Sequence, residues 1–235
     1  MTMLPAVSGV SILYHMDWPH TDPDGRPVIF TERDPRPRPD EMLPTLRGKA
    51  VRLEPLQEKH IDALCEIGFD PGITRFMTTA METREDMARY VGSALAARTA
   101  GKAIPFVTIL RDPGGADRIV GTTRFMEIDR GNRRMEIGAT WLGKQWQRSR
   151  VNTEAKYLML RHAFEELKSI RIELKTDSLN VRSRAAILRI GALQEGVFRN
   201  HVITEQGRIR HSVYFSIVAG DWPAVKARLE AMLER

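Results

Sequence analysis

The sequence contains a single cysteine, Cys65, so no disulfide can form within the chain. One thiol is typical of a reducing compartment, and we expect a cytoplasmic protein. No stretch approaches the ~18 consecutive apolar residues that a membrane-spanning helix needs. Residues 1–14 lack a basic n-region and are interrupted by Pro5 and Gly9, so they do not resemble a signal peptide. These absences exclude a disulfide-stapled scaffold and argue against secretion or membrane insertion.

Metal-ligand spacing is missing as well, because the six histidines are scattered along the chain. The formal net charge of +6 and the isoelectric point of about 9.7 favour polyanionic ligands. Nucleic acid is one candidate, but no run of five Lys or Arg residues occurs and the aromatic residues do not interleave with the basic ones. We therefore favour a cofactor with several phosphates, and expect neither a metal ion nor nucleic acid as a ligand.

Proline is unevenly distributed, since eight of the thirteen prolines lie at or before Pro44. Residues 1–41 also carry seven acidic residues against four arginines, which leaves the remainder strongly basic. Repeated proline prevents a regular helix or a central strand. We therefore predict a Pro-rich, flexible extension at residues 1–44 and one folded domain at residues 45–235.

Hydrophobic periodicity divides the predicted domain into helices and strands. The predicted strands cover residues 50–53, 105–111, 119–129, 134–142, 170–176, 197–203 and 208–218, and the predicted helices cover residues 57–68, 85–99, 153–167, 180–190 and 222–233. Turn residues join the strands between 105 and 142 into an antiparallel meander. A helix between the strands at 134–142 and 170–176 implies one parallel pair. The predicted fold class is α/β (α+β), a mixed, mostly antiparallel central sheet with helices on both faces.

The most informative segment joins the strand that ends at Leu142 to the helix predicted from Thr153, with Asn152 or Thr153 as its cap. Such a junction directs unpaired backbone N–H groups and the positive end of a helix dipole toward one point, which suits a phosphate. Arg148 and Arg150 can add charge-assisted hydrogen bonds to the same anion. The alternative interpretation is a solvated connecting loop, as at most helix N-termini.

The segment from Gln147 to Asn152 resembles the pyrophosphate motif Gln/Arg-x-x-Gly-x-Gly/Ala of the GNAT superfamily of N-acetyltransferases. Segments 46–56, 136–141, 152–155 and 162–167 are similar to its Rim-type branch, which is ribosomal-protein alanine acetyltransferase-like. A second block begins with Asp177 to Ser183 and extends to residues 190–192. It is similar to the superfamily's Asn-x-x-Ser/Ala helix. The resemblance covers residues 45–218 and implies the GNAT fold with acetyl-CoA as cosubstrate.

The resemblance also implies which residues form the site. A backbone N–H near Trp141 or Leu142 would stabilise the tetrahedral intermediate. Glu136 on the same strand is the candidate general base, and an ion pair with Arg124 or Arg134 is its alternative role. The implied coenzyme A ligands are Trp141, Leu142, Gln147, Arg148, Ser149, Arg150, Val151, Asn152, Asn180 and Ser183.

The sequence departs from the superfamily at two site positions. Arg150 replaces a glycine or small residue that lets phosphate approach the backbone, so its side chain either folds over the pyrophosphate or crowds the site. Ile187 replaces the tyrosine that serves many members as the acid for the departing thiolate. The Rim-type branch places a serine at the position of Ser183, so we predict Ser183 as the catalytic acid. Its alternative role is to satisfy the first turn of its helix, and Asn180 is expected to fix the backbone near the cofactor.

These features predict an acetyl-CoA-dependent N-acetyltransferase in which a primary amine attacks the thioester directly in a ternary complex. The expected acceptor is a protein N-terminus or an amine-bearing small molecule, without a membrane partner. A non-catalytic acyl-CoA-binding or scaffolding relative is the alternative, which the residues at positions 150 and 187 suggest. A nucleic-acid-binding module is a third hypothesis. Sheet edges leave room for a homodimer, and the sequence does not identify the acceptor.

Overall fold

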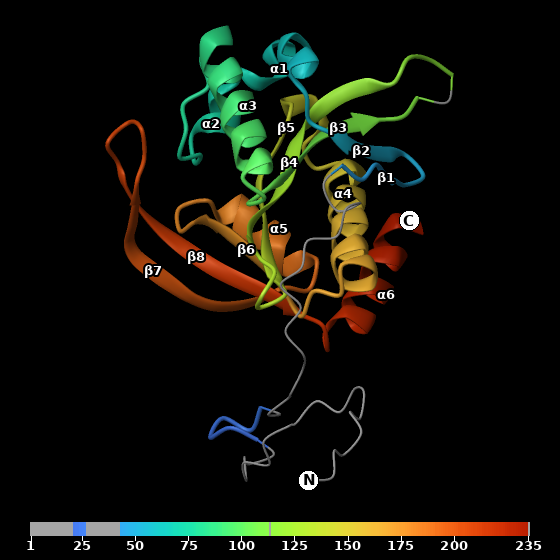
Figure 1. Cartoon of the computed structure of the whole chain (residues 1–235), viewed down its shortest axis with the longest axis vertical. Coiled ribbons are helices and arrows are strands. Elements are labelled where there is room, and N and C mark those ends of the chain that lie inside the picture. Colours follow the sequence, from blue (N-terminus) through green and yellow to red (C-terminus); the bar gives the residue numbers. More distant parts are fainter. Residues whose placement is uncertain (1–20, 27–42, 113, 235) are drawn as a thin grey trace, which may run out of the picture. The chain divides into compact units, whose positions relative to one another are not determined.

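The computed structural model of the chain describes residues 21–26, 43–112 and 114–234 (Figure 1). Contacts divide the chain into two units, residues 1–33 and residues 34–235. The described part of the first unit is a tight turn in which the Gly25 amide donates to the Asp22 carbonyl at 2.9 Å. Most of the predicted extension at residues 1–44 lies outside the described residues, so its flexibility and its boundary stay predictions.

The second unit contains a mixed eight-stranded sheet, and this confirms the predicted fold class. Its strands follow the order β1-β2-β3-β4-β5-β6-β8-β7. All neighbours are antiparallel except β5 and β6, which form the parallel pair expected from the helix between them. The strands are β1 (Leu46–Arg47), β2 (Val51–Pro55), β3 (Ile104–Leu110), β4 (Arg118–Asp129), β5 (Arg134–Leu142), β6 (Arg171–Asp177), β7 (Leu193–Ile203) and β8 (Ile209–Val218).

Helical segments cover both faces of the sheet. They are η2 (Glu58–His60), α1 (Ile61–Gly68), α2 (Pro71–Thr74), α3 (Arg84–Thr99), η3 (Lys144–Trp146), α4 (Arg150–Arg161), the π-helical η4 (His162–Glu166), α5 (Val181–Arg189) and α6 (Trp222–Glu234). Local chemistry sets their ends: Thr83 and Asp86 form a reciprocal capping box that starts α3, and Pro71 occupies the first turn of α2. In Figure 1, α1–α3 gather over one region of the sheet, whereas α4 and α6 pack against each other.

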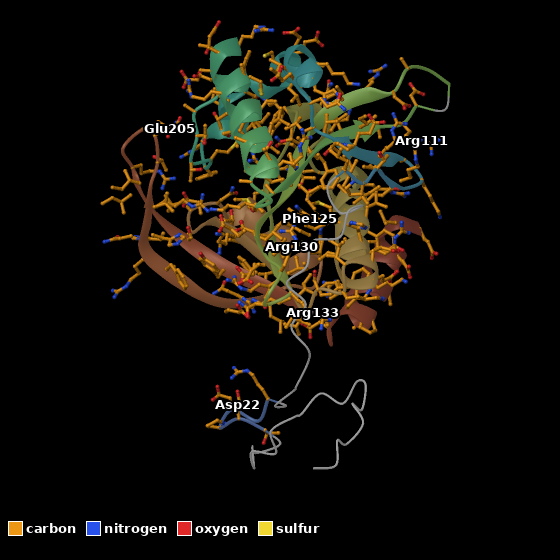
Figure 2. The ribbon with its side chains drawn as sticks, in the orientation of Figure 1. Asp22, Arg111, Phe125, Arg130, Arg133 and Glu205 are labelled. Atoms are coloured by element: carbon orange, nitrogen blue, oxygen red, sulfur yellow. The ribbon has the colours of Figure 1, made fainter. Side chains whose placement is uncertain are left out.

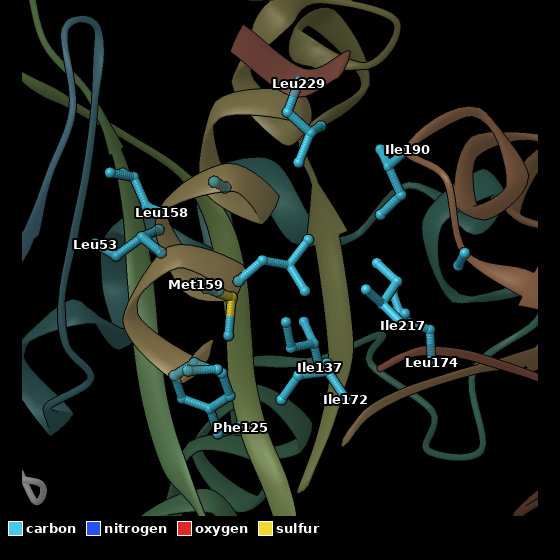
Figure 3. Close-up of a cluster of buried hydrophobic side chains, with 14 of the residues drawn as sticks. Leu53, Phe125, Ile137, Leu158, Met159, Ile172, Leu174, Ile190, Ile217 and Leu229 are labelled. Carbon is cyan, nitrogen blue, oxygen red and sulfur yellow. The ribbon is translucent and has the colours of Figure 1, made fainter. Parts of the chain in front are cut away.

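Two buried clusters form the core, one on each face of the sheet. Ile104 and Phe106 of β3 belong to the first cluster, which lies beneath α4, α5 and α6 (Figure 3). Val107 and Ile109 of the same strand belong to the second cluster, which packs against α1 and α3. Because successive side chains of a strand point to opposite faces, β3 supplies both clusters.

The helix that follows β5 begins earlier than predicted. We expected it from Thr153 with a cap at Asn152 or Thr153, but α4 begins at Arg150 and Ser149 is its N-cap. The Ser149 hydroxyl accepts the Val151 amide at 3.3 Å and donates to the Trp146 carbonyl at 2.6 Å. Serine is a strong N-cap residue, so the first-turn amides lie three residues earlier along the chain than the sequence indicated.

A bulge interrupts β5 shortly before this junction. Gly138 pairs with Arg124 and Trp141 pairs with Thr122, so two residues of β5 face one residue of β4. Ala139 adopts a φ of 46°, in the left-handed region that non-glycine residues rarely occupy. The Tyr90 hydroxyl donates to the Ala139 carbonyl at 3.2 Å and fixes the bulge from α3.

Candidate functional site

The sheet opens between β5 and β6. The two strands pair only from Arg134 to Glu136 and from Arg171 to Glu173, although β5 continues to Leu142 and β6 to Asp177. Within the described residues, the edge of β5 after Glu136 has no strand beside it on the β6 side. An unpaired strand edge presents backbone N–H and C=O groups that an extended ligand can bind.

The predicted phosphate loop lies at the far end of this unpaired edge. Gln147 holds the loop in place: its Nε2 donates to the Leu142 carbonyl at 3.0 Å, and its Oε1 accepts Nη1 of Arg182 at 2.7 Å. Arg148 takes a left-handed φ of 62°, which turns the chain into α4. The first turn of α4 presents amides without intrahelical acceptors beside this edge, as a phosphate site requires.

The side chains of the next three predicted ligands have different surroundings. The Arg150 side chain extends to the end of α6, where its Nη1 donates to the Leu233 carbonyl at 3.3 Å. The arginine in this structure therefore neither folds over the α4 N-terminus nor crowds it, and a guanidinium at a helix C-terminus also suits the helix dipole. Val151 is buried in the first cluster. The Oδ1 atom of Asn152 is buried and has no hydrogen-bond partner among the described residues.

Trp141 and Leu142, the predicted oxyanion donors, lie at the end of β5 with their side chains on opposite faces. Trp141 belongs to the second cluster and Leu142 to the first. Their backbones pair with Thr122 and Gly121 of β4. The structure therefore places both residues where the unpaired edge of β5 meets the phosphate loop.

Glu136 lies where the β5–β6 pairing stops and is almost fully buried. Its Oε2 forms an ion pair with Nζ of Lys175 on β6 at 2.6 Å. The predicted ion pair of Glu136 with Arg124 or Arg134 is therefore wrong. Arg124 lies over the Tyr90 ring, and Arg134 pairs with Asp129 on β4 and Glu173 on β6. Burial raises the pKa of the Glu136 carboxyl, while Lys175 acts in the opposite direction. A carboxyl with a raised pKa beside the gap suits proton transfer.

The second predicted block starts α5 at the end of β6. Asn180 is the N-cap, and its Oδ1 accepts the Ser183 amide at 3.0 Å. Ser183 thus takes part in the first turn through its backbone, and its side chain is only half-buried. Ile187, at the position of the superfamily tyrosine, packs into the first cluster. The acid role of Ser183 stays a prediction.

One functional candidate escaped the sequence analysis. Lys156, in the second turn of α4, is buried, and its Nζ donates to Oγ1 of Thr140 on β5 at 2.7 Å. Burial lowers the pKa of Lys156 to about 7. The available signal was a lysine directly beside the apolar stripe of a predicted core helix.

A hollow of about 410 Å³ lies on the face of the sheet that carries Lys175. Its walls come from β4 to β8 and combine charged residues with two stacked rings, those of Phe198 and Tyr214, whose centroids are 4.2 Å apart. The lining residues are Glu127, Arg134, Arg171, Glu173, Lys175, Glu195, Gly196, Phe198 and Tyr214. The hollow shares Lys175 with the Glu136 ion pair, so it adjoins the gap between β5 and β6.

The β7–β8 hairpin is tied to the segment between α2 and α3. At its tip, labelled in Figure 2, the Glu205 amide donates to the Thr78 carbonyl at 3.0 Å and the Glu205 carboxylate accepts the Ala80 amide at 2.8 Å. These bonds join the helical segment at residues 69–99 to the hairpin at residues 197–218. The hairpin therefore extends to the α2–α3 segment and is fixed there at its tip.

Comparison with known families agrees with this architecture. Residues 50–193 match the acetyltransferase (GNAT) domain family, which is more than half of the chain. The chain therefore belongs to the GNAT family of acetyltransferases, as its motifs implied. It is an acetyl-CoA-dependent N-acetyltransferase, and its relatives include Rim-type proteins.

Three similar proteins illustrate this relationship. YdaF of Bacillus subtilis, provisionally named a ribosomal N-acetyltransferase, is 32% identical over 46% of this chain and 58% of its own. A GCN5-related N-acetyltransferase from Brucella melitensis is 29% identical with a TM-score of 0.74, covering 87% of this chain and 89% of its own. RimJ of Mycobacterium smegmatis, solved in complex with CoA-disulfide, is 23% identical with a TM-score of 0.65 over 81% and 92% of the two chains, which shows a shared fold.

In the ranges 21–26, 43–112 and 114–234, no helix combines the length and apolar character that a bilayer crossing requires.

Proposed function

We propose that this protein transfers the acetyl group of acetyl-CoA to a primary amine by direct attack within a ternary complex. The acceptor is a protein N-terminus or an amine-bearing small molecule. The observation that carries the proposal is the gap between β5 and β6, where an unpaired strand edge runs from a buried carboxyl at one end to a helix N-terminus at the other. Membership of the GNAT family supports the same reaction.

The residues along the gap fit coenzyme A. The α4 N-terminus offers first-turn amides to a diphosphate, and Arg150 leaves them open because its guanidinium binds Leu233. The Oδ1 of Asn152, which has no partner in the described ranges, and the edge of β5 offer acceptors and donors to an amide-containing chain. In our proposal Asn180 and Ser183 bound the opposite side, at the end of β6. The cosubstrate supplies an activated acyl group when it is bound.

The proton transfers fall to side chains of this protein. Glu136 is the proposed base, acting directly or through a water molecule, because its pKa is raised and it lies at the closed end of the gap, paired with Lys175 of the hollow. Backbone N–H groups at the end of β5 steady the developing oxyanion. Ser183 is the proposed acid for the departing thiolate, since the tyrosine position holds the core residue Ile187.

Calorimetry with coenzyme A and a thiol-release assay with an amine and N-terminal peptide panel test the proposal. We expect coenzyme A to bind and thiol release to depend on the amine. Failure of coenzyme A to bind would overturn the assignment. Binding without thiol release from any amine would favour the alternative of a non-catalytic acyl-CoA-binding relative.

Ser183→Ala tests the acid role separately. The variant should lose turnover while its affinity for acetyl-CoA changes little, and Ser93→Ala on α3 is the matched control that should retain both. A Ser183→Ala enzyme that loses affinity but keeps its turnover when saturated would show that Ser183 only holds the cofactor. The expected homodimer and cytoplasmic location stay predictions.

A further inference from the structure

The buried lysine on α4 has no counter-charge in the part of the chain that the structure describes. Lys156 exposes 7% of its surface, and among the described residues no carboxylate lies within ion-pair distance of its Nζ. Its one hydrogen-bond acceptor is the Thr140 hydroxyl, which in turn bonds the hydroxyl of Thr123 at 2.7 Å. An ammonium can donate three hydrogen bonds, so the side chain keeps donor capacity in a buried position. Such an arrangement is costly and therefore points to a ligand.

The surrounding charges do not neutralise this lysine. Glu136 on β5 acts on it only as a charge at longer range and forms its ion pair with Lys175. Glu154, on α4 itself, accepts the Ala50 amide at 3.1 Å. Glu230 on α6 accepts the hydroxyl of Tyr157 at 2.8 Å.

The position of Lys156 identifies the part of the site that it faces. Thr140 lies on the stretch of β5 that has no β6 partner, one residue before Trp141. Asn152, one helical turn before Lys156 on the same side of α4, carries the buried oxygen without a partner among the described residues. Asn152 and Lys156 therefore lie on the same side of α4, and both have hydrogen-bonding capacity that is not used within the described residues.

We propose that Lys156 is a further catalytic residue, whose Nζ donates a hydrogen bond to the thioester carbonyl oxygen and to the oxyanion that forms from it. This inference rests on the proposed function, because it needs the acyl group to lie along the edge of β5. Thr140 is the positioning residue, since its hydroxyl fixes the Nζ beside that edge. A donor held in place before the reaction stabilises the charge that develops in the transition state more than it stabilises the ground state.

A pair of coenzyme A analogues isolates this contact. In the carbonyl analogue a methylene replaces the sulfur of acetyl-CoA, and in the matched control analogue a methylene replaces the carbonyl as well. The two ligands differ only in the oxygen that Lys156 is proposed to bind. Calorimetry compares both on the full-length wild-type protein, on Lys156→Met, on Thr140→Val and on the control variant Lys226→Met, whose side chain on α6 pairs with Glu165 of η4.

Lys156→Met should weaken the carbonyl analogue about 10-fold and the control analogue less than about 2-fold, because the hydrogen bond from Nζ to the carbonyl oxygen is lost only in the first case. Its kcat should fall about 100-fold, as for the loss of one oxyanion donor. Thr140→Val should also weaken the carbonyl analogue more than the control analogue, but by a smaller factor. Lys226→Met should weaken neither.

Equal weakening of both analogues by Lys156→Met, or none, would overturn the role of Lys156 while leaving the acetyltransferase proposal intact. If neither analogue nor coenzyme A bound the wild-type protein, the proposed function itself would fail. If Lys156→Met does not fold, Thr140→Val still tests the proposal. It removes the hydroxyl that holds Lys156 Nζ in place and leaves the shape of the side chain almost unchanged.

Discussion

Glu136 shows how the environment of one residue sets its chemistry. The side chain is buried at the junction of β5 and β6, where desolvation favours the neutral carboxyl. Lys175 limits that effect through their ion pair, and the charges of Glu127 and Glu173 reinforce it. A carboxyl whose pKa is raised in this way holds its proton to a higher pH than a solvated carboxyl does.

The raised pKa of Glu136 makes stability depend on pH with an unusual sign. The folded protein holds the proton more tightly than the unfolded chain, so this group stabilises the fold at low pH and that contribution is lost as the pH rises from 4.5 through the folded pKa. Glu136→Gln removes the titration. Urea denaturation should therefore show the variant gaining stability relative to wild type across this range. Parallel pH curves for the two proteins would contradict the prediction.

Lys156 has the opposite charge, and its pKa is shifted in the opposite direction. Its lowered pKa means that the folded protein releases a proton that the unfolded chain still binds, between pH 10.5 and about 7. Wild-type stability should fall as the pH decreases through this window, by about 1.4 kcal/mol for each pH unit at most. Lys156→Met should lack this fall, so its advantage in urea denaturation should grow toward pH 7 and then level off. A pH-independent difference would mean that the lysine is solvated.

At the scale of elements, the strands were more predictable than the loop that carries the site. The bounds of β5 agree with the prediction because turn residues flank an alternating segment. The start predicted for α4 was wrong because Arg148 and Arg150 are typical of a loop, whereas Ser149 between them caps the helix. The π-helical turn of η4 and the four-residue α2 have no periodicity that a sequence window can detect.

Gly121 tests how tightly β4 holds the site strand. A Cβ at this position would lie 2.0 Å from the Trp141 carbonyl oxygen and 2.9 Å from the Leu142 Cα, so the backbone of β5 would have to move. We expect Gly121→Ala to lower the free energy of unfolding by about 3 kcal/mol and to weaken coenzyme A binding.

The matched control is Gly92→Ala on α3, where an added Cβ meets nothing within 4 Å. This substitution should raise stability by about 1 kcal/mol through helix propensity alone. Urea denaturation measures both variants. An unchanged Gly121→Ala protein would show that β4 and β5 are less tightly packed than the structure indicates.

At the scale of the whole domain, the order of elements could be predicted, but their long-range arrangement could not. The helix between β5 and β6 correctly implied the parallel pair. Three other features depend on contacts between segments far apart in the chain: the early end of that pairing, the Glu136–Lys175 ion pair and the docking of the β7–β8 hairpin. Local sequence patterns carry no information about such contacts.

The hairpin tip offers a test of acceptor recognition at this scale. Glu205→Ala removes the carboxylate that accepts the Ala80 amide and should loosen the link between the hairpin and the α2–α3 segment. We expect KM for the acceptor to rise several-fold while KM for acetyl-CoA stays within about 2-fold, because the bonds of Glu205 go to Thr78 and Ala80 of the α2–α3 segment and not to the phosphate loop. Steady-state kinetics with both substrates varied would measure this.

The neighbouring Gln206→Ala is the control for the tip itself, since Gln206 is exposed. It should leave both constants unchanged. An equal rise in both constants for Glu205→Ala would mean that the hairpin supports the fold as a whole and does not act on the acceptor in particular.

The divergence of β5 from β6 also bears on solubility. Most unpaired strand edges lie at the rim of a sheet, where a strand from another molecule can align with them and start aggregation. Here the unpaired edge lies in the interior of the sheet and shares a tapering space with β6. A strand from another molecule would clash with β6 before it could pair along the whole edge. The edge can therefore stay accessible to a slender ligand without pairing with neighbouring chains.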